Sequence, residues 1–292
     1  MKPPPFEYAA PDTLEEAVAL KADRGDEAVV LAGGQSLIPL LALRLANPSM
    51  LIDLNRVREL EYVREEKEWL VVGAMTRHRA VEESANLLER LPILADALPL
   101  IGHRAIRNRG TVGGSIAHAD PAAEWPALVL ALDGAVEAIG PRGARIVDAG
   151  EFFLTYFTNA LQPEEILREV RLRLPKTRVG SAFVEYARRY GDFGLAGVAA
   201  VLAFDRKERV SAASIALLGL AETPVRATEA EVGLQGEVPT DERIEAAAAV
   251  CRGSVDPAGD IHGSPEYRRH LVGVLAGRAL RLARERAGVT SR

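Results

Sequence analysis

The chain has 292 residues, of which 48% are hydrophobic and 26% are charged, and its formal net charge is −5 at pH 7. These values are typical of a globular protein, and the acidic balance gives no electrostatic reason to expect a nucleic acid or an anionic membrane as partner. The sequence contains no run of 18 apolar residues and begins without an apolar signal segment. We therefore expect no membrane span, no nucleic-acid partner and a cytoplasmic location.

The single cysteine, Cys251, limits the redox chemistry that the chain can support by itself. One thiol excludes an internal disulfide and an iron–sulfur cluster held by four cysteines of this chain. The five histidines are scattered, so we expect no metal site. Cys251 lies in an alanine-rich predicted helix, where a buried apolar role is the usual one.

The first 57 residues alternate between strand and helix patterns. Thr13 is followed by Leu14, Glu15 and Glu16, a sequence typical of a capped helix start. Short connections between alternating elements favour a small parallel sheet with right-handed crossovers. The predicted strands are 6–8, 28–32 and 50–54, and the predicted helices are 14–24 and 37–45.

The pattern changes after residue 57, and a mixed α and β region follows as far as residue 175. Two hairpins are predicted around charged or glycine-containing turns, at 61–72 and 135–148. Helices are predicted at 76–83, 87–101 and 125–132, and a strand at 166–174. Thr76 is expected to cap the first of these helices.

A third pattern occupies residues 176–292. Three antiparallel strands are predicted within 183–187, 195–204 and 210–218, and the helices 225–234, 241–252 and 265–286 follow. Pro265 after Ser264 is a favourable start for the last helix. The sequence therefore predicts an α+β protein with domains 1–57, 58–175 and 176–292.

The first of two glycine-rich stretches, Ala32-Gly33-Gly34-Gln35-Ser36, lies between a predicted strand and a predicted helix. Glycine lets a ligand approach backbone N–H groups without a Cβ in the way, and a helix start leaves N–H groups unpaired. This arrangement suits a pyrophosphate. The spacing matches neither the common dinucleotide fingerprint nor a P-loop, and a plain tight turn is the alternative.

The second stretch, Thr111-Val112-Gly113-Gly114-Ser115, lies about eighty residues further along and follows Gly110. Three glycines in five residues disfavour the interior of a helix or a strand, so we expect an ordered irregular loop. Long ordered loops usually carry a function. The two stretches are interpreted as the two walls of one flavin site, and a compact loop without a ligand is the alternative.

At these residues the sequence resembles a known family. The segments 31–48, 101–126 and 260–271 are similar to the FAD-binding medium subunit of the molybdenum hydroxylases, which include aerobic carbon monoxide dehydrogenase and xanthine dehydrogenase. The resemblance extends over nearly the whole chain. It implies an FAD-binding fold of the vanillyl-alcohol-oxidase (PCMH) type with two subdomains, followed by a C-terminal α+β domain with a three-stranded antiparallel sheet and helices.

The resemblance also implies a set of cofactor-binding residues. The first stretch would wrap the FAD pyrophosphate, the second would line the flavin and diphosphate from the other side, and an aromatic residue would cover the flavin ring. Glu124 stands where the family commonly has an aspartate near the adenosine ribose, and Asp120 is the rival for that role. The set comprises Leu31, Ala32, Gly33, Gly34, Gln35, Ser36, Leu37, Ile38, Ile101, Thr111, Val112, Gly113, Gly114, Ser115, Asp120, Glu124 and Phe193.

Some of these residues also have interpretations that involve no cofactor. Phe193 is expected over the flavin by resemblance, but burial in a core is the usual fate of an aromatic side chain. His118 can contact the cofactor or be satisfied by the backbone. Thr76 and His78 can reach the flavin edge, with the helix cap at Thr76 as the favoured alternative. Some relatives have a lysine in the strand that precedes Phe193, and residues 183–186 of this chain contain none.

The sequence offers no nucleophile–base pair, so no catalytic residue is assigned, and a redox carrier fits this absence. The resemblance implies that a large molybdenum subunit oxidises the substrate and a small subunit with two [2Fe–2S] clusters passes electrons to FAD in this chain. A heterohexamer with two copies of each chain is expected by resemblance. The substrate and the acceptor (NAD, quinone or oxygen) stay open. The alternatives are a stand-alone flavin oxidase or dehydrogenase, a non-catalytic FAD-binding subunit, and a structural module without flavin.

Overall fold

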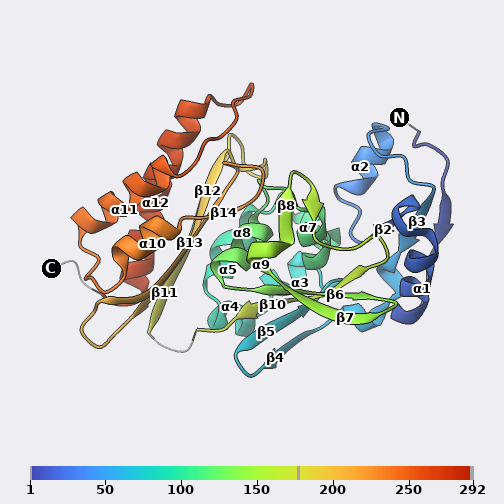
Figure 1. The fold of residues 1–292 in the computed structure, drawn as a ribbon, viewed down its shortest axis with the longest axis horizontal. Coiled ribbons are helices and arrows are strands. Elements are labelled where there is room, and N and C mark those ends of the chain that lie inside the picture. The colour runs from blue at the N-terminus through green and yellow to red at the C-terminus, as the bar shows by residue number, and fades with distance from the viewer. Residues whose placement is uncertain (1, 176–177, 290–292) are drawn as a thin grey trace.

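The computed structural model describes residues 2–175 and 178–289. Three β-sheets follow one another along the long axis in chain order, and helices pack between and outside them (Figure 1). The N-terminal part is blue, the middle part green, and the C-terminal part orange to red. The mixed helix and sheet content confirms an α+β fold. Residues 176 and 177, at the expected start of the third domain, lie outside the described residues.

The N-terminal sheet is parallel, as predicted. Its central strand β3 (Met50–Asp53) pairs in parallel with β1 (Glu7–Ala9) on one side and β2 (Ala28–Leu31) on the other. Thr13 accepts a hydrogen bond from the Glu16 N–H and caps α1 (Leu14–Arg24). The next helix, α2 (Leu37–Ala42), is shorter than predicted. Short 3₁₀ turns lie at Gly25–Glu27, Leu54–Arg56 and Arg58–Leu60.

The middle sheet has five antiparallel strands in the order β4-β5-β10-β6-β7. The two predicted hairpins form its edges, and the strand predicted at 166–174 lies at its centre. The strands are β4 (Val63–Glu66), β5 (Trp69–Gly73), β6 (Ala135–Gly140), β7 (Gly143–Asp148) and β10 (Ile166–Arg173). A separate two-stranded ribbon contains β8 (Phe153–Thr155) and β9 (Thr158–Asn159).

The helices of the middle part differ from the prediction at several places. The expected helix 87–101 is divided into α4 (Ala85–Arg90), α5 (Ile93–Ala97) and a 3₁₀ turn (Leu98–Leu100), because Pro92 cannot donate a helical hydrogen bond. Thr76 does not cap a helix; its hydroxyl donates to the Tyr62 carbonyl at 2.9 Å. The remaining helices are α3 (His78–Glu82), α6 (Arg104–Arg109), α7 (Val112–His118), α8 (Glu124–Ala131) and α9 (Ala149–Phe152). Of these, α6, α7 and α9 are not predicted from the sequence.

The prediction of an irregular loop at the second glycine stretch is wrong, because helix α7 begins in this stretch. The Thr111 hydroxyl accepts from the Gly114 N–H at 3.0 Å and so caps the helix. Each glycine in a helix costs about 1 kcal/mol relative to alanine, and a cap recovers a similar amount. A Cβ on Gly113 would lie 2.5 Å from the Ala74 Cβ, so the missing side chain lets α7 pack directly on this segment.

The C-terminal sheet is antiparallel, and both of its faces are covered. Three strands lie where they are predicted, and a two-residue strand, β14, adds a fourth at the edge, so the helix expected from 225 begins at Thr228. Helices α10 and α12 pack on one face, with α11 packed against both of them, and α5 and α8 cover the other face (Figure 1). The elements are β11 (Val179–Tyr186), β12 (Ala196–Phe204), β13 (Val210–Leu218), β14 (Val225–Arg226), α10 (Thr228–Leu234), α11 (Asp241–Gly253) and α12 (Pro265–Arg286).

Two further sequence expectations in this part are confirmed. Ser264 accepts from the Tyr267 N–H and caps α12, with Pro265 in the first turn. Cys251 is fully buried among the apolar side chains between the sheet and its helices. Burial raises the pKa of its thiol to about 12, so this cysteine is an inert apolar side chain at neutral pH.

Candidate functional site

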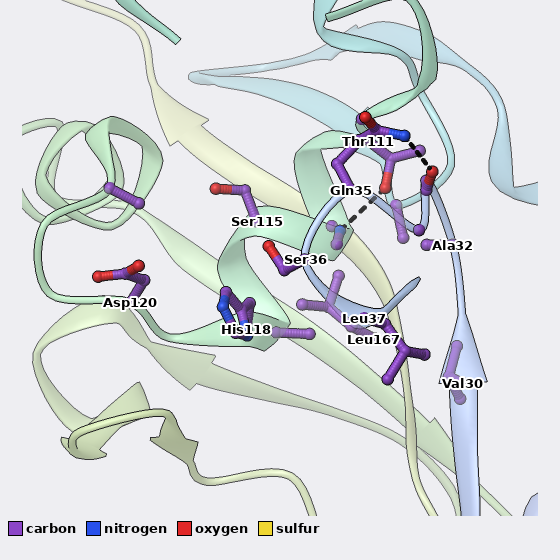
Figure 2. A pocket seen from close by; sticks show the side chains of 18 of the residues that line it. Val30, Ala32, Gln35, Ser36, Leu37, Thr111, Ser115, His118, Asp120 and Leu167 are labelled. Atoms are coloured by element: carbon purple, nitrogen blue, oxygen red, sulfur yellow. Dashed lines mark hydrogen bonds between the residues drawn. The ribbon is translucent and has the colours of Figure 1, made fainter. Parts of the chain in front are cut away.

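A cavity of about 630 Å³ lies where the three parts of the chain meet. Most of its wall comes from four places: the segment from β2 to α2, helix α7 with the residues before and after it, the segment that enters β10, and the loop between β11 and β12. Further residues come from α1, from the segment that follows β5 and from the stretch 101–106. Figure 2 shows labelled side chains of the first two segments beside Asp120 and Leu167. The volume is in the range of roughly 300–1,000 Å³ that is usual for pockets that hold small-molecule ligands.

Most residues that the sequence suggests for cofactor binding line this cavity. Three do not. Val112 is fully buried in the core, Ile38 is 48% exposed on the outer side of α2, and Leu31 lies outside the wall. The residues of the set that line the cavity are Ala32, Gly33, Gly34, Gln35, Ser36, Leu37, Ile101, Thr111, Gly113, Gly114, Ser115, Asp120, Glu124 and Phe193.

The first glycine stretch presents unpaired backbone donors. Within the described part of the chain, no acceptor satisfies the N–H groups of Gly34, Gln35 or Ser36. Gly34 has φ +73°, a conformation that favours glycine, and the Gln35 side chain donates to the Gly33 carbonyl at 3.0 Å. Helix α2 has only six residues, so these turn N–H groups, rather than a helix dipole, make this wall suitable for an anion.

The second glycine stretch contributes differently, because its backbone donors are already used. It offers the cavity the Ser115 hydroxyl and a smooth glycine surface, and Ser36 and Ser115 extend toward the same space from opposite walls (Figure 2). The hydrogen bonds that occupy the donors are Val112 N to Thr76 O (3.0 Å), Gly113 N to Ala74 O (3.0 Å), Gly114 N to Thr111 Oγ1 (3.0 Å) and Ser115 N to Thr111 O (3.1 Å).

The two stretches touch directly, although eighty residues separate them in the sequence. A Cβ on Gly33 would lie 2.4 Å from the Arg109 carbonyl oxygen and 2.7 Å from the Gly110 Cα. A Cβ on Gly110 would in turn meet the His78 ring at 2.7 Å. Glycine at these positions therefore sets the distance between the two walls.

Two histidines at the cavity are uncharged at neutral pH. Burial lowers the pKa of His78 to about 3, and its Nδ1 accepts a hydrogen bond from the Trp125 Nε1–H at 2.9 Å. Burial also lowers the pKa of His118, whose ring packs against Phe157 with centroids 5.1 Å apart. Neither ring supplies a positive charge for an anionic ligand.

Three carboxyl groups gather near one part of the cavity. Burial raises the pKa of Asp120, and it raises the pKa of Glu124, which is only 6% exposed, to about 7. Sequence reasoning missed the third, Glu185 on β11, whose pKa burial and the neighbouring Glu124 raise to about 8. A signal was present, because Phe183 and Glu185 are two apart on a strand and therefore face the same side, into the protein.

Phe193 is 64% exposed and lines the cavity, so its interpretation as a core aromatic is wrong. The loop that carries it is anchored nearby. The Tyr190 hydroxyl donates to the Pro99 carbonyl at 2.7 Å, and Gly191, at φ +85°, packs so closely on His103 that a Cβ would lie 2.4 Å from its ring. Phe193 is thus an accessible ring at the edge of the cavity.

The described residues contain neither a membrane-spanning helix nor a cluster of metal-ligating side chains. No helix in the ranges 2–175 and 178–289 is long and apolar enough to cross a membrane. No group of three or more histidine, cysteine, aspartate or glutamate side chains in those ranges could hold a metal ion. The cavity is therefore the candidate functional site of the described residues.

The fold and the cavity define a class of protein, an FAD-binding domain followed by a flavoprotein C-terminal domain. Residues 4–176 match the family model of the FAD-binding domain in molybdopterin dehydrogenase, and residues 181–283 match that of the CO dehydrogenase flavoprotein C-terminal domain. The chain belongs to this family of flavoprotein subunits.

Relatives over the whole length agree with this assignment. The chain is 40% identical over 290 residues to the 6-hydroxypseudooxynicotine dehydrogenase complex subunit alpha of Paenarthrobacter nicotinovorans, covering 99% of this chain and 98% of that protein. It is 40% identical over 285 residues to the carbon monoxide dehydrogenase medium chain of Hydrogenophaga pseudoflava, covering 97% and 98%. A solved carbon monoxide dehydrogenase from that organism superimposes with a TM-score of 0.95 at 41% identity, covering 98% of this chain and 99% of that chain.

Proposed function

We propose that this chain is the FAD-binding subunit of a molybdenum-containing hydroxylase or dehydrogenase. The observation that carries the proposal is the set of unpaired N–H groups of Gly34, Gln35 and Ser36, which face a cavity of cofactor size in a chain of this family. Unpaired backbone donors in a glycine turn suit the phosphate oxygens of a dinucleotide.

The residues of the cavity fit FAD in three ways. The turn Gly33–Ser36 would hold the pyrophosphate, and the Ser36 and Ser115 hydroxyls can donate to it from both walls. Glu124 or Asp120 would accept from a ribose hydroxyl, and Phe193 would cover the flavin ring. When bound, FAD can accept electrons singly and release them as a pair, and the protein's part is to bind and orient it and to limit its access to water.

We further propose the assembly and the domain division that the sequence suggests. Relatives are named as a medium chain or as a subunit of a complex, which supports a role within a multi-subunit enzyme. A small partner with [2Fe–2S] clusters and a large partner with the molybdenum cofactor would complete a cytoplasmic heterohexamer of two copies of each chain. The separate sheets support the domains 1–57, 58–175 and 176–292.

The first test is FAD binding by the full chain. We expect a flavin absorbance spectrum that survives desalting, with a stoichiometry near one FAD per chain. Co-expression with the iron–sulfur and molybdenum partners should then let the substrate of the complex bleach the flavin bands. A stand-alone oxidase would instead be reduced by its own substrate without partners, and a non-catalytic subunit would keep oxidised FAD in the complex. A chain that stays colourless with excess FAD, alone and in the complex, would refute the proposal.

The exposed ring of Phe193 gives a local prediction. Because the side chain has few protein contacts to lose, Phe193→Ala should change the unfolding free energy by no more than about 0.5 kcal/mol. The fluorescence and the visible spectrum of bound FAD should change, since the ring would stack on the flavin. The matched control is Ile261→Ala, at a side chain that is 92% exposed and lies outside the cavity wall. Identical flavin spectra in Phe193→Ala and wild type would contradict this role.

A further inference from the structure

A buried glutamate, Glu124, and a partly exposed one, Glu185, lie on the two sides of the boundary between the FAD-binding part and the C-terminal sheet. Glu124 is the first residue of α8 and lines the cavity, and Glu185 lies on β11, on the same strand face as Phe183, which packs in one hydrophobic cluster with α8 side chains. The Gly219 N–H, which donates to the Pro121 carbonyl at 2.8 Å, holds the two parts together. The charge of Glu124 contributes to the raised pKa of Glu185, so the two carboxyl groups are electrostatically coupled.

The pair has no counter-ion among the described residues. No other described residue forms a hydrogen bond or an ion pair with the Glu124 carboxyl, and Oε2 of Glu185 is buried without a partner. The guanidinium of Arg268, from α12, makes no hydrogen bond or ion pair with either carboxyl group: its Nη atoms donate to the Leu195 carbonyl at 2.8 Å, to the Gly219 carbonyl at 3.2 Å and to Asp260 at 2.8 Å, and its Nε is buried without a partner. On the cavity side, Asp120 adds a further carboxyl and His118 is neutral.

The wall of the cavity is also poor in positive charge. Lys21 is the only lysine or arginine among the described lining residues, against the carboxyl groups of Asp26, Asp120, Glu124, Glu165 and Asp192. Of these, Glu165 is already paired with Arg145 at 2.7 Å. The Lys21 Nζ already donates to two backbone carbonyls, at 2.7 and 2.8 Å. A dinucleotide brings negative phosphates into this cavity. Lysine and arginine side chains of the described wall therefore offset little of this charge.

We propose that Glu124 and Glu185 form a proton-binding pair that takes up protons from solvent when an anionic dinucleotide enters the cavity. The ligand identity rests on the proposed function above. In this step a carboxylate oxygen bonds to a proton from the surrounding water and buffer, and no electron moves. The pair lowers the negative charge of the wall without a cation, and it makes binding depend on pH.

The pH range in which the two carboxyl groups titrate supports this role. Burial, with a contribution from the charge of Asp120, raises the pKa of Glu124 to about 7, and burial together with the charge of Glu124 raises that of Glu185 to about 8, so both titrate near neutral pH. A nearby negative ligand raises both values further, since a like charge disfavours the ionised carboxyl. By linkage, the affinity for FAD should fall as pH rises above neutrality, by up to about tenfold per pH unit for each proton taken up.

The test is calorimetric titration of FAD into the full chain near pH 8, in two buffers that differ in ionisation enthalpy. The difference in heat counts the protons taken up per FAD bound. We expect a clear uptake in wild type, and a loss of most of it in Glu124→Gln/Glu185→Gln, which should also bind FAD with a flatter pH dependence. The matched control is Glu151→Gln, at an exposed glutamate outside the cavity wall, with wild-type uptake expected.

Every other outcome of these experiments either supports or overturns the proposed proton-binding pair. No uptake in wild type, or full uptake in the double variant, would overturn the proton-binding pair and leave FAD binding intact. Uptake that disappears in His118→Gln but persists in the double variant would assign the proton to that ring and overturn the proposal as well. If the wild-type chain does not bind FAD, infrared spectra of the chain alone decide: a protonated-carboxyl band that titrates near neutral pH and is lost in Glu185→Gln supports the pair, and its absence refutes it.

Discussion

Replacing Gly33 with alanine is expected to lower the affinity for FAD at least about tenfold and the unfolding free energy by about 1–3 kcal/mol, as overpacking does. The added methyl group would lie 2.4 Å from the Arg109 carbonyl oxygen and 2.7 Å from the Gly110 Cα. Backbone atoms cannot yield as a flexible side chain can, so the two walls must separate. Flavin fluorescence titration and urea unfolding measure the two effects.

The control for this variant is Gly150→Ala, in α9. A Cβ at Gly150 has no neighbour within 4 Å, and its backbone conformation accepts alanine. This variant should bind FAD as wild type does and should be equally stable or slightly more so, because alanine favours a helix. Wild-type binding and stability in Gly33→Ala would mean that the contact between the two glycine stretches does not shape the site.

The second large effect expected is a change in the pH dependence of stability in Glu185→Gln. The folded-state pKa of about 8 lies above the ordinary value of 4.5, so the folded chain binds more protons than the unfolded chain between these values. Stability must therefore fall as pH rises through this window, and it falls no further once pH exceeds the folded-state pKa. Glutamine carries no charge, so the variant should lose about 2 kcal/mol less than wild type between about pH 6 and about pH 9.

Urea unfolding of both proteins across this range, without cofactor, provides the measurement. The buried histidines affect both proteins alike, because their lowered pKa values change stability mainly below about pH 6.5, so their contribution cancels in the comparison. Glu151→Gln is again the control, and its curve should run parallel to that of wild type. Parallel curves for Glu185→Gln and wild type would show that the Glu185 carboxyl is solvated and that the pair with Glu124 does not form.

Local sequence signals determined the elements whose information lies within a few residues. Thr13 and Ser264 cap helices because their hydroxyls reach N–H groups three residues ahead, a geometry that the chain sets locally. Alternating patterns around tight turns placed both hairpins of the middle sheet for the same reason. The resemblance to a family then extended this local information to the cofactor and to a set of residues, most of which line the cavity.

Local rules failed where contacts between distant residues outweighed them. The glycines at 113 and 114 disfavour a helix, yet α7 forms there, because Thr111 caps it and the absent side chain lets it pack on Ala74. The contact of Gly33 with Arg109 and Gly110 is likewise invisible in the sequence, since it depends on how two subdomains approach. Helix propensity depends on the residues of one segment. The conformation at these glycines depends instead on the segment that packs against them.

The charge state of the cavity belongs wholly to the tertiary structure. By itself the sequence determined the composition, the capped helices, the strand patterns and the glycine stretches, because each depends on neighbouring residues. Only folding brings Glu185 of the C-terminal sheet against Glu124 of α8, and only burial there raises both pKa values toward neutrality. The sequence around a carboxyl group does not show how much solvent or which charges the group will meet in the folded protein. Its pKa is therefore set only when the two parts of the chain pack together.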